Sequence, residues 1–343
     1  MIFAKSPQID IPDWHERVHQ FLERSNLAVE SDDFVPLTGD ASNRRYVRVF
    51  PKATKSFVLA IYEQRFEYET LPFVTVSKLL HGLSVPVPEI LEHVEALGIL
   101  ALEDLGDVTL QAHVGTGPAT DHEALYGEAI DHIVTLQQHR PSKQTSTLLP
   151  FTVTFDAKKF LWELNYFLKY FVGAYRGIQL PPAHHEMVNL EFIKLSEELA
   201  QEPRILCHRD FHSRNLMLHQ NQLYVIDFQD ARMGPATYDL SSLLRDSYVD
   251  ISEDTVNRMI GRYIDKMQIR EDPSEFRCKF DTMALQRNLK ALGTFGYQTA
   301  ARRNPVYIQY IPRTIRYVRD TLLHYSKFSR LQDVLSTYMS DLK

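Results

Sequence analysis

Cysteine is scarce in this sequence: Cys207 and Cys278 are the two in a chain of 343 residues. So few thiols argue against a disulfide framework and favour the reducing cytoplasm. Residues 1–18 contain no continuous apolar run of the kind that forms the centre of a signal peptide. No segment is long and apolar enough to span a bilayer. We therefore expect a cytoplasmic protein without a signal peptide and without membrane association.

The sequence also lacks a strong charge bias, internal repeats and low-complexity tracts. The formal net charge is -6, which gives no support for nucleic acid or an acidic membrane as a partner. Scattered histidines such as His81, His93 and His219 form no convergent ligand pattern, so a zinc site is not indicated. The length of 343 residues suits one large or two modest domains with a sizeable core. We expect a monomer.

Residues 205–230 combine short apolar runs with polar residues in a pattern that points to a site. The apolar runs at its start, middle and end are typical of short strands. Asp210, Asn215 and Asp227 lie near the ends of these runs, so the strands would bring the three side chains together. Two carboxylates and an amide oxygen suit Mg²⁺, which prefers oxygen ligands and is usually held by one or two carboxylates plus substrate phosphates.

The same segment reads H-R-D-x-x-x-x-N, then a strand and D-F, and so resembles the catalytic and metal-binding loops of protein-kinase-like phosphotransferases. The resemblance implies that Asp210 accepts the proton of an attacking hydroxyl, and that Asn215 and Asp227 hold Mg²⁺ at the phosphates of ATP. His208 and, in the next helix, Asp239 would support the loop structurally. The alternative is a polar surface loop, but spacing, residue types and strand context together disfavour it.

The segments before residue 103 predict a small sheet accompanied by helices. Apolar periodicity and turn residues indicate helices and strands in alternation. We expect a helix at 13–24, strands within 34–50 and at 57–61, a helix at 70–82 and a hairpin at 90–102.

The turn near residue 40 is the candidate phosphate-covering loop of this sheet. The small Ser42 and its neighbour Asn43 would let backbone N–H groups approach the phosphates. Arg44 and Arg45 would clamp them with positive charge, although a solvated hairpin with two surface arginines has the same composition. The strand at 57–61 lacks the lysine that protein kinases carry there. Either one of these arginines replaces its charge, or the kinase fold is catalytically weakened.

The chain changes character after residue 106. Glu103 and Leu105 belong to a strand exit that resembles the kinase linker between lobes, where backbone groups bind the adenine edge. We therefore expect a nucleotide-binding lobe at 1–105 and a helical lobe at 106–343 that carries the catalytic, metal and sugar sites. The periodicity of the second part predicts helices at 121–139, 156–172, 185–201, 237–249, 253–267, 280–298 and 306–325.

Two features separate this chain from protein kinases. Asp227-Phe228 is followed by Gln229-Asp230 rather than by Gly, and no A-P-E segment or long activation loop follows. The short connection suits a small acceptor molecule. The pattern resembles the aminoglycoside and choline phosphotransferases, and more closely the bacterial anomeric sugar kinases of cell-wall recycling (AmgK type). Four stretches carry the closer resemblance: 39–49, 100–107, 207–246 and 284–297, the last of which reads ALQRNLKALGTFGY.

The resemblance implies an α+β, two-lobed protein-kinase-like fold and ATP-dependent phosphorylation of the anomeric hydroxyl of N-acetylmuramic acid or N-acetylglucosamine. Glu163, Gln229 and Asp230 are then candidate ligands of the sugar hydroxyls. The residues themselves reach only as far as a Mg²⁺-dependent phosphotransferase that acts on a small hydroxyl compound. An aminoglycoside- or choline-type kinase stays open as an alternative, as does a nucleotide-binding pseudokinase that serves as an interaction module.

Overall fold

The computed structural model contains two compact units, Met1–Gly82 with Pro86–Asp107 and Leu83–Val85 with Val108–Lys343. The first is built on a sheet and the second is mostly helical, which confirms the predicted α+β class. No helix within the described ranges is both long and apolar enough to cross a membrane. The structure describes residues 13–27, 33–37, 44–52, 54–116, 119–143 and 145–343.

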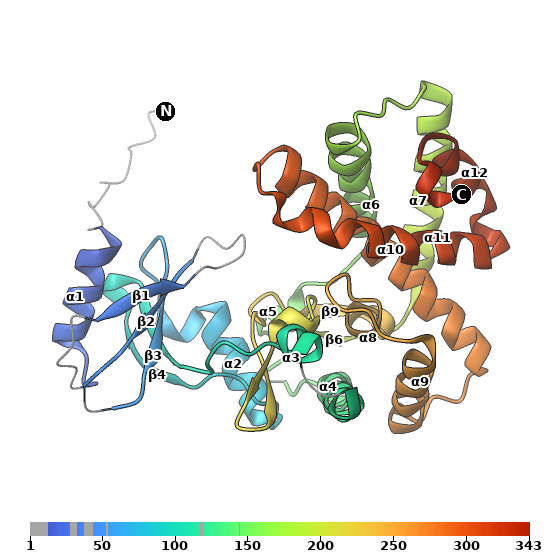
Figure 1. Ribbon diagram of the computed structural model, residues 1–343. Coiled ribbons are helices and arrows are strands. Elements are labelled where there is room, and N and C mark those ends of the chain that lie inside the picture. Colours follow the sequence, from blue (N-terminus) through green and yellow to red (C-terminus); the bar gives the residue numbers. More distant parts are fainter. Residues whose placement is uncertain (1–12, 28–32, 38–43, 53, 117–118, 144) are drawn as a thin grey trace, which may run out of the picture. The chain divides into compact units, whose positions relative to one another are not determined.

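The N-terminal unit is organised around a five-stranded antiparallel sheet in the order β1-β2-β3-β5-β4 (Figure 1). Its β-branched and aliphatic residues pair in register, as where Val47 lies opposite Leu59, and both of these side chains are fully buried. The predicted strand at 57–61 and the predicted hairpin are confirmed. The strands are β1 (Phe34–Leu37), β2 (Arg45–Val49), β3 (Phe57–Ile61), β4 (Ile90–Val94) and β5 (Ile99–Glu103).

Helix α1 (Trp14–Arg24) shares a core with this sheet, as predicted from its periodicity. Val18 and Phe21 are fully buried there. Arg17 anchors the helix, because its Nε donates to the carbonyl oxygen of Leu97 at 2.8 Å. The other helical segments of the unit are η1 (Tyr68–Thr70), α2 (Pro72–Gly82) and η2 (Glu95–Leu97).

The C-terminal unit is a helical assembly with two small sheets. Its α-helices are α3 (Leu110–Thr116), α4 (Ala119–Gln138), α5 (Leu149–Thr152), α6 (Ala157–Tyr166), α7 (Pro182–Gln201), α8 (Thr237–Leu244), α9 (Glu253–Met267), α10 (Pro273–Ala300), α11 (Ile311–His324) and α12 (Ser329–Tyr338). A π-helix, η3 (Phe167–Tyr175), continues α6. The 3₁₀ turns are η4 (Ser213–Asn215), η5 (Pro305–Tyr310), η6 (Ser326–Phe328) and η7 (Ser340–Leu342).

The two small sheets frame the segment that the sequence singled out. Strand β6 (Arg204–Cys207) pairs antiparallel with β9 (Arg232–Pro235), and β7 (Leu216–His219) pairs antiparallel with β8 (Gln222–Val225). Strands β6, β7 and β8 were predicted. Strand β9 was not, because a short run that contains Gly and Pro does not look like a strand.

Helix α10 lies at the centre of the C-terminal unit and packs against α6, η3, α8 and α11 (Figure 1). Its contact with η3 is unusually close. A Cβ atom at Gly296 would lie 2.5 Å from the carbonyl oxygen of Tyr170, and one at Gly293 would lie 2.9 Å from the backbone nitrogen of Phe167. Glycine at both positions therefore allows the two helices to touch.

Several predicted helix boundaries were wrong. The single helix expected at 156–172 is α6 followed by the π-helical η3, a difference that apolar periodicity does not reveal. The helix expected at 237–249 ends at Leu244. Thr at position 237 suggests an N-cap, but Ala236 holds that position and the Thr237 hydroxyl donates to Glu202 at 3.1 Å. The short α3 and α5 and the C-terminal α12 were not predicted.

Candidate active site

The loop 208–215 connects β6 to β7, and α8 fixes its backbone. The carboxylate of Asp239 accepts hydrogen bonds from the backbone N–H groups of His208 at 2.6 Å and Arg209 at 3.0 Å. The His208 ring nitrogen Nε2 lies 3.0 Å from the carbonyl oxygen of Ile226, which joins the loop to the end of β8. Arg209 has a φ of +89°, a conformation that such surrounding contacts must hold. This geometry agrees with the structural role proposed for His208 and Asp239.

Asp246 holds the same loop from the segment after α8. Its Oδ2 accepts a hydrogen bond from the backbone nitrogen of Ser213 at 2.9 Å, and its Oδ1 accepts one from the backbone nitrogen of Tyr248 at 2.8 Å. Burial raises the pKa of Asp246, which these hydrogen bonds partly offset. Asp246 was not predicted as a site residue, although it lies in the stretch 207–246.

Asp210 lies at the surface of the loop, with 28% of its side chain exposed, and faces basic side chains of α10. Lys290 Nζ lies 3.3 Å and Arg287 Nη2 lies 3.8 Å from Asp210 Oδ1, while Arg209 Nε lies 3.6 Å from Oδ2. Burial alone would raise the pKa of Asp210, but the charges of Lys290, Arg209 and Arg287 hold it well below its ordinary range. Asp210 is therefore a carboxylate at neutral pH.

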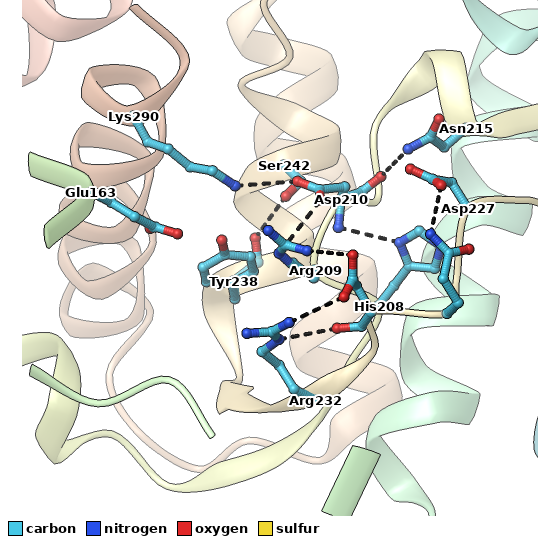
Figure 2. A network of polar contacts seen from close by, with 12 residues as sticks. Glu163, His208, Arg209, Asp210, Asn215, Asp227, Arg232, Tyr238, Ser242 and Lys290 are labelled. Atoms are coloured by element: carbon cyan, nitrogen blue, oxygen red, sulfur yellow. Dashed lines mark hydrogen bonds and ion pairs between the residues drawn. The ribbon is translucent and has the colours of Figure 1, made fainter. Parts of the chain in front are cut away.

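Asn215 and Asp227 lie beside one another on the opposite side of Asp210 from Lys290 in the view of Figure 2. Asn215 Nδ2 donates to the carbonyl oxygen of Asp210 at 2.9 Å. This contact assigns the amide orientation and leaves Oδ1 as the outer atom. Asp227 is exposed, follows β8 and has a φ of +61°, an uncommon conformation for a non-glycine residue.

The residues that follow Asp227 make hydrogen bonds and an ion pair with neighbouring side chains. Gln229 Nε2 donates to Asp227 Oδ1 at 2.8 Å, so one candidate sugar ligand contacts a candidate metal ligand. Asp230, the second candidate sugar ligand, pairs with Arg209 at 2.7 Å, and Arg232 Nε donates to its carbonyl oxygen at 3.0 Å (Figure 2). Asp230 is half-exposed, and Gln229 is partly buried.

Glu163, the third candidate sugar ligand, is nearly inaccessible, with 1% of its side chain exposed. It accepts a hydrogen bond from Gln286 Nε2 of α10 at 2.9 Å, and Lys159 Nζ lies 3.8 Å from its other oxygen. Figure 2 shows it on the Lys290 side of Asp210. Burial lowers the pKa of Lys159, which the charge of Glu163 partly offsets.

A cavity of about 160 Å³ opens beside Asp210 within the C-terminal unit. Its walls come from the 208–215 loop, the end of α8 and the middle of α10. Arg287 and Lys290 line it together with Asp210. The arrangement can orient a hydroxyl at Asp210, as phosphoryl transfer to a small acceptor requires, and it can hold a negatively charged group near that hydroxyl.

Comparison with known proteins assigns this chain to a family. Residues 33–275 match the model of the phosphotransferase enzyme family. The chain belongs to this family. It is 31% identical to the N-acetylmuramate/N-acetylglucosamine kinase of Neisseria meningitidis, over 97% of this chain and 96% of that protein. It is 30% identical to the protein of the same name from Pseudomonas aeruginosa, over 89% and 88% of the two chains.

Solved structures of phosphotransferases share the fold. The ADP-bound aminoglycoside phosphotransferase APH(2'')-Ib matches with a TM-score of 0.58 and 14% identity, over 91% of this chain and 98% of that chain. Choline kinase LicA from Streptococcus pneumoniae matches with a TM-score of 0.58 and 18% identity, over 91% of this chain and all of that chain (100%). The predicted kinase-like fold of this phosphotransferase is thus confirmed.

The predicted nucleotide contacts of this phosphotransferase belong to the N-terminal unit. Ser42 and Asn43 lie outside the described residues. The Arg44 guanidinium lies 5.8 Å from the ring centroid of Tyr46. The Arg45 guanidinium lies 4.7 Å from the ring centroid of Trp14, so an α1 side chain holds it in the cation–π arrangement.

The strand exit that was predicted to contact the adenine is also part of this unit. Glu103 ends β5 and its Oε2 accepts a hydrogen bond from the backbone nitrogen of Glu89 at 3.3 Å. Leu105 is buried. Between them, Asp104 pairs with Arg48 Nε at 2.8 Å, an ion pair that the sequence did not reveal. The roles of Glu103 and Leu105 stay predictions.

Arg287 and Lys290 of the phosphotransferase were not predicted as site residues. Their stretch, 284–297, indicated only the resemblance to sugar kinases. The available signal was a pair of basic residues three positions apart, which a helix places on one face. Their contact with Asp210 depends on how α10 packs in the folded unit.

Proposed function

We propose that this phosphotransferase moves the γ-phosphoryl group of ATP to the anomeric hydroxyl of an amino sugar, N-acetylmuramic acid or N-acetylglucosamine. The observation that carries the proposal is the 31% identity to the Neisseria meningitidis N-acetylmuramate/N-acetylglucosamine kinase over 97% of this chain. A carboxylate that is ionised at neutral pH and lies beside a small cavity supports a small hydroxyl compound as the acceptor. Such an activity belongs in the recycling of cell-wall sugars.

The reaction is a direct in-line transfer. The sugar hydroxyl oxygen forms a bond to the γ-phosphorus while the bond from that phosphorus to the bridging oxygen of ADP breaks. Asp210 accepts a hydrogen bond from the hydroxyl, orients it and takes its proton. Because the transition state is loose, the proton leaves late and orientation contributes most. The lowered pKa of Asp210 keeps it ionised at neutral pH, which suits it to orienting the hydroxyl as a hydrogen-bond acceptor.

Asn215 and Asp227 are the residues proposed to hold Mg²⁺. The donor set fits, because an amide oxygen and a carboxylate are hard oxygen ligands. A bound Mg²⁺ would supply positive charge that offsets the negative charge of the phosphates. Gln229 holds the Asp227 carboxylate through its amide, which restricts the rotation of that carboxylate.

The remaining proposed contacts divide between the two units. Arg44 or Arg45 supplies the positive charge that the strand lysine supplies in protein kinases, and the β5 exit binds the adenine edge through its backbone. In the C-terminal unit, Gln229 and Asp230 contact sugar hydroxyls. Glu163 is too buried in this structure to reach a sugar directly, so its contact requires that the Gln286 bond be exchanged for one to the sugar.

The test is ADP release from Mg-ATP over a panel of acceptors. The panel holds N-acetylmuramic acid, N-acetylglucosamine, glucose, galactose, kanamycin and choline. The proposal predicts turnover on the N-acetyl sugars, and ³¹P and ¹H NMR of the product should locate the phosphate on the anomeric oxygen. Turnover on kanamycin or choline alone would contradict the sugar assignment. ATP binding without turnover of any acceptor would favour the pseudokinase.

A further inference from the structure

The cationic surroundings of Asp210 exceed what this one carboxylate can neutralise. Lys290, Arg287 and Arg209 all lie within 3.8 Å of its oxygens. Arg209 is also paired with Asp230 at 2.7 Å, so Arg287 and Lys290 share the single negative charge of Asp210 and one positive charge is in excess. A partly buried positive charge without a full counter-charge is unfavourable, so an anion that binds there gains more than it would at the surface.

Lys290 is charged and only loosely engaged. Burial alone would lower its pKa, but the negative charge of Asp210 and the neighbouring Tyr238 and Glu163 raise it. Its ammonium lies 3.3 Å from Asp210, longer than the roughly 2.7 to 2.9 Å of a strong charge-assisted hydrogen bond. Arg287 is held in place, because its Nη1 donates to the Arg209 carbonyl oxygen at 2.9 Å.

Lys290 approaches Asp210 from the side opposite to the proposed phosphate site. In Figure 2 it reaches Asp210 from one side, while Asn215 and Asp227 lie on the other. If Asp210 orients the attacking hydroxyl toward the phosphates, the rest of the acceptor extends toward Lys290. The anion that Lys290 and Arg287 meet therefore belongs to the acceptor.

The cavity on this side suits one branch of a sugar. Its volume of about 160 Å³ is below the roughly 300 to 1,000 Å³ of pockets that enclose a whole drug-sized ligand. Among the residues that line it, Arg245 already pairs with Glu253, at 2.6 Å and 3.0 Å. The carboxylate of Asp246 is turned to the backbone nitrogens of Ser213 and Tyr248. Arg287 and Lys290 remain as the cations that a ligand in the cavity would meet.

We propose that Lys290 and Arg287 form a carboxylate-binding subsite, and that a carboxylate-bearing amino sugar is the preferred acceptor. The inference rests on the proposed sugar-kinase function and adds the substrate class and the residues that select it. Lys290 approaches the acceptor carboxylate as a point charge, and Arg287 offers the second donor from the same face of α10.

The test compares N-acetylmuramic acid with its methyl ester, which keeps the side branch, removes its charge and adds one methyl group. Initial rates of ADP release at saturating Mg-ATP give kcat and KM for each. The wild-type protein should prefer the acid by about 10- to 100-fold in kcat/KM, the range expected for a hydrogen bond between charged groups. In Lys290→Gln this preference should fall toward one, chiefly through a higher KM for the acid.

Two further variants keep the result interpretable. Lys290→Arg preserves the charge and should retain most of the preference for the acid. Lys279→Gln makes the same substitution on the same helix at an exposed lysine that pairs with Glu271, and it should behave as the wild type. Thermal unfolding of all three variants shows whether the fold is intact. If Lys290→Gln is unstable, the comparison of acid and ester in the wild-type protein still tests the subsite.

Three outcomes would overturn the subsite. One is a wild-type protein that turns over the acid and the ester equally. Another is a Lys290→Gln variant that loses kcat equally on both, which would place Lys290 at the transferring phosphoryl group or at Asp210 alone. The third is turnover of N-acetylglucosamine without N-acetylmuramic acid, which would leave the proposed function standing. Failure on every amino sugar would instead refute the proposed function itself.

Discussion

Two pairs of aspartates around the 208–215 loop use the same side chain for different purposes. Asp210 and Asp227 are accessible, with Asp210 28% exposed and Asp227 exposed, and they face side chains. Asp239 and Asp246 are buried and accept hydrogen bonds from backbone nitrogens. The accessible pair can exchange its contacts for a ligand, whereas the buried pair holds the loop that presents them.

The pKa shifts of Asp210 and Asp239 have opposite signs. Burial would raise the pKa of both, but cationic side chains outweigh it at Asp210 and lower the pKa there. At Asp239, burial outweighs the charge of His208 and the two backbone hydrogen bonds, and the pKa is raised. Substitutions of the accessible pair should therefore affect turnover, and those of the buried pair should affect stability.

The largest expected effect is on turnover at Asp227. Asp227→Ala removes a proposed metal ligand and should lower kcat by more than about 1,000-fold, because several kcal/mol of charge stabilisation at the phosphates is lost. The measurement is ADP release with N-acetylmuramic acid at several Mg²⁺ concentrations. Asp265→Ala, at an exposed aspartate of α9, is the control. Activity within about tenfold of wild type would show that Asp227 does not hold the metal.

The next effect concerns stability at Asp239. Asp239→Ala leaves the backbone nitrogens of His208 and Arg209 without their buried acceptor, and should lower the free energy of unfolding by about 2 to 4 kcal/mol. Urea unfolding followed by circular dichroism measures this quantity. Asp246→Ala should show a loss of the same kind. A change below about 0.5 kcal/mol in both would remove the distinction between the pairs.

The contributions of Asp210 and Asp239 to the free energy of unfolding should depend on pH in opposite directions. Asp210, with a lowered pKa, contributes stability above the ordinary aspartate value of 3.8 and loses it as the pH falls through its folded value. Asp239, with a raised pKa, contributes stability below 3.8 and loses it as the pH rises through its folded value. The measurement is urea unfolding of wild type, Asp210→Asn and Asp239→Asn between about pH 3 and 6. As the pH rises, the stability of the wild type relative to Asp210→Asn should increase, and its stability relative to Asp239→Asn should decrease. Parallel curves would contradict the assigned shifts.

The smallest effect tests how α10 is positioned. Gly296→Ala forces a Cβ to within 2.5 Å of the Tyr170 carbonyl oxygen and should destabilise the protein by about 1 to 3 kcal/mol. Gly261→Ala in α9 has no atom within 4 Å of the new Cβ and should stabilise by about 0.5 kcal/mol. Equal effects of the two substitutions on unfolding would show that the contact between α10 and η3 is not close.

Much of this arrangement follows from local sequence. The spacing of Asp210, Asn215 and Asp227 predicts that these three side chains lie close together, since short strands and tight turns determine where their ends lie. Asp239 also follows from the motif. Lys290 could not be assigned, because it meets Asp210 across 80 positions of sequence through the packing of α10. The π-helix η3 was not predicted for a related reason, since its close contact with two glycines of α10 depends on tertiary packing.

The most direct test of the central claim is the rate of phosphoryl transfer by Asp210→Asn. A single-turnover experiment with Mg-ATP and N-acetylmuramic acid separates this step from product release. We predict a rate about 100- to 10,000-fold below wild type, the usual contribution of a positioned acid–base group, with ATP binding retained. A variant that transfers phosphate within about tenfold of the wild-type rate would contradict the role of Asp210 and with it the proposed mechanism.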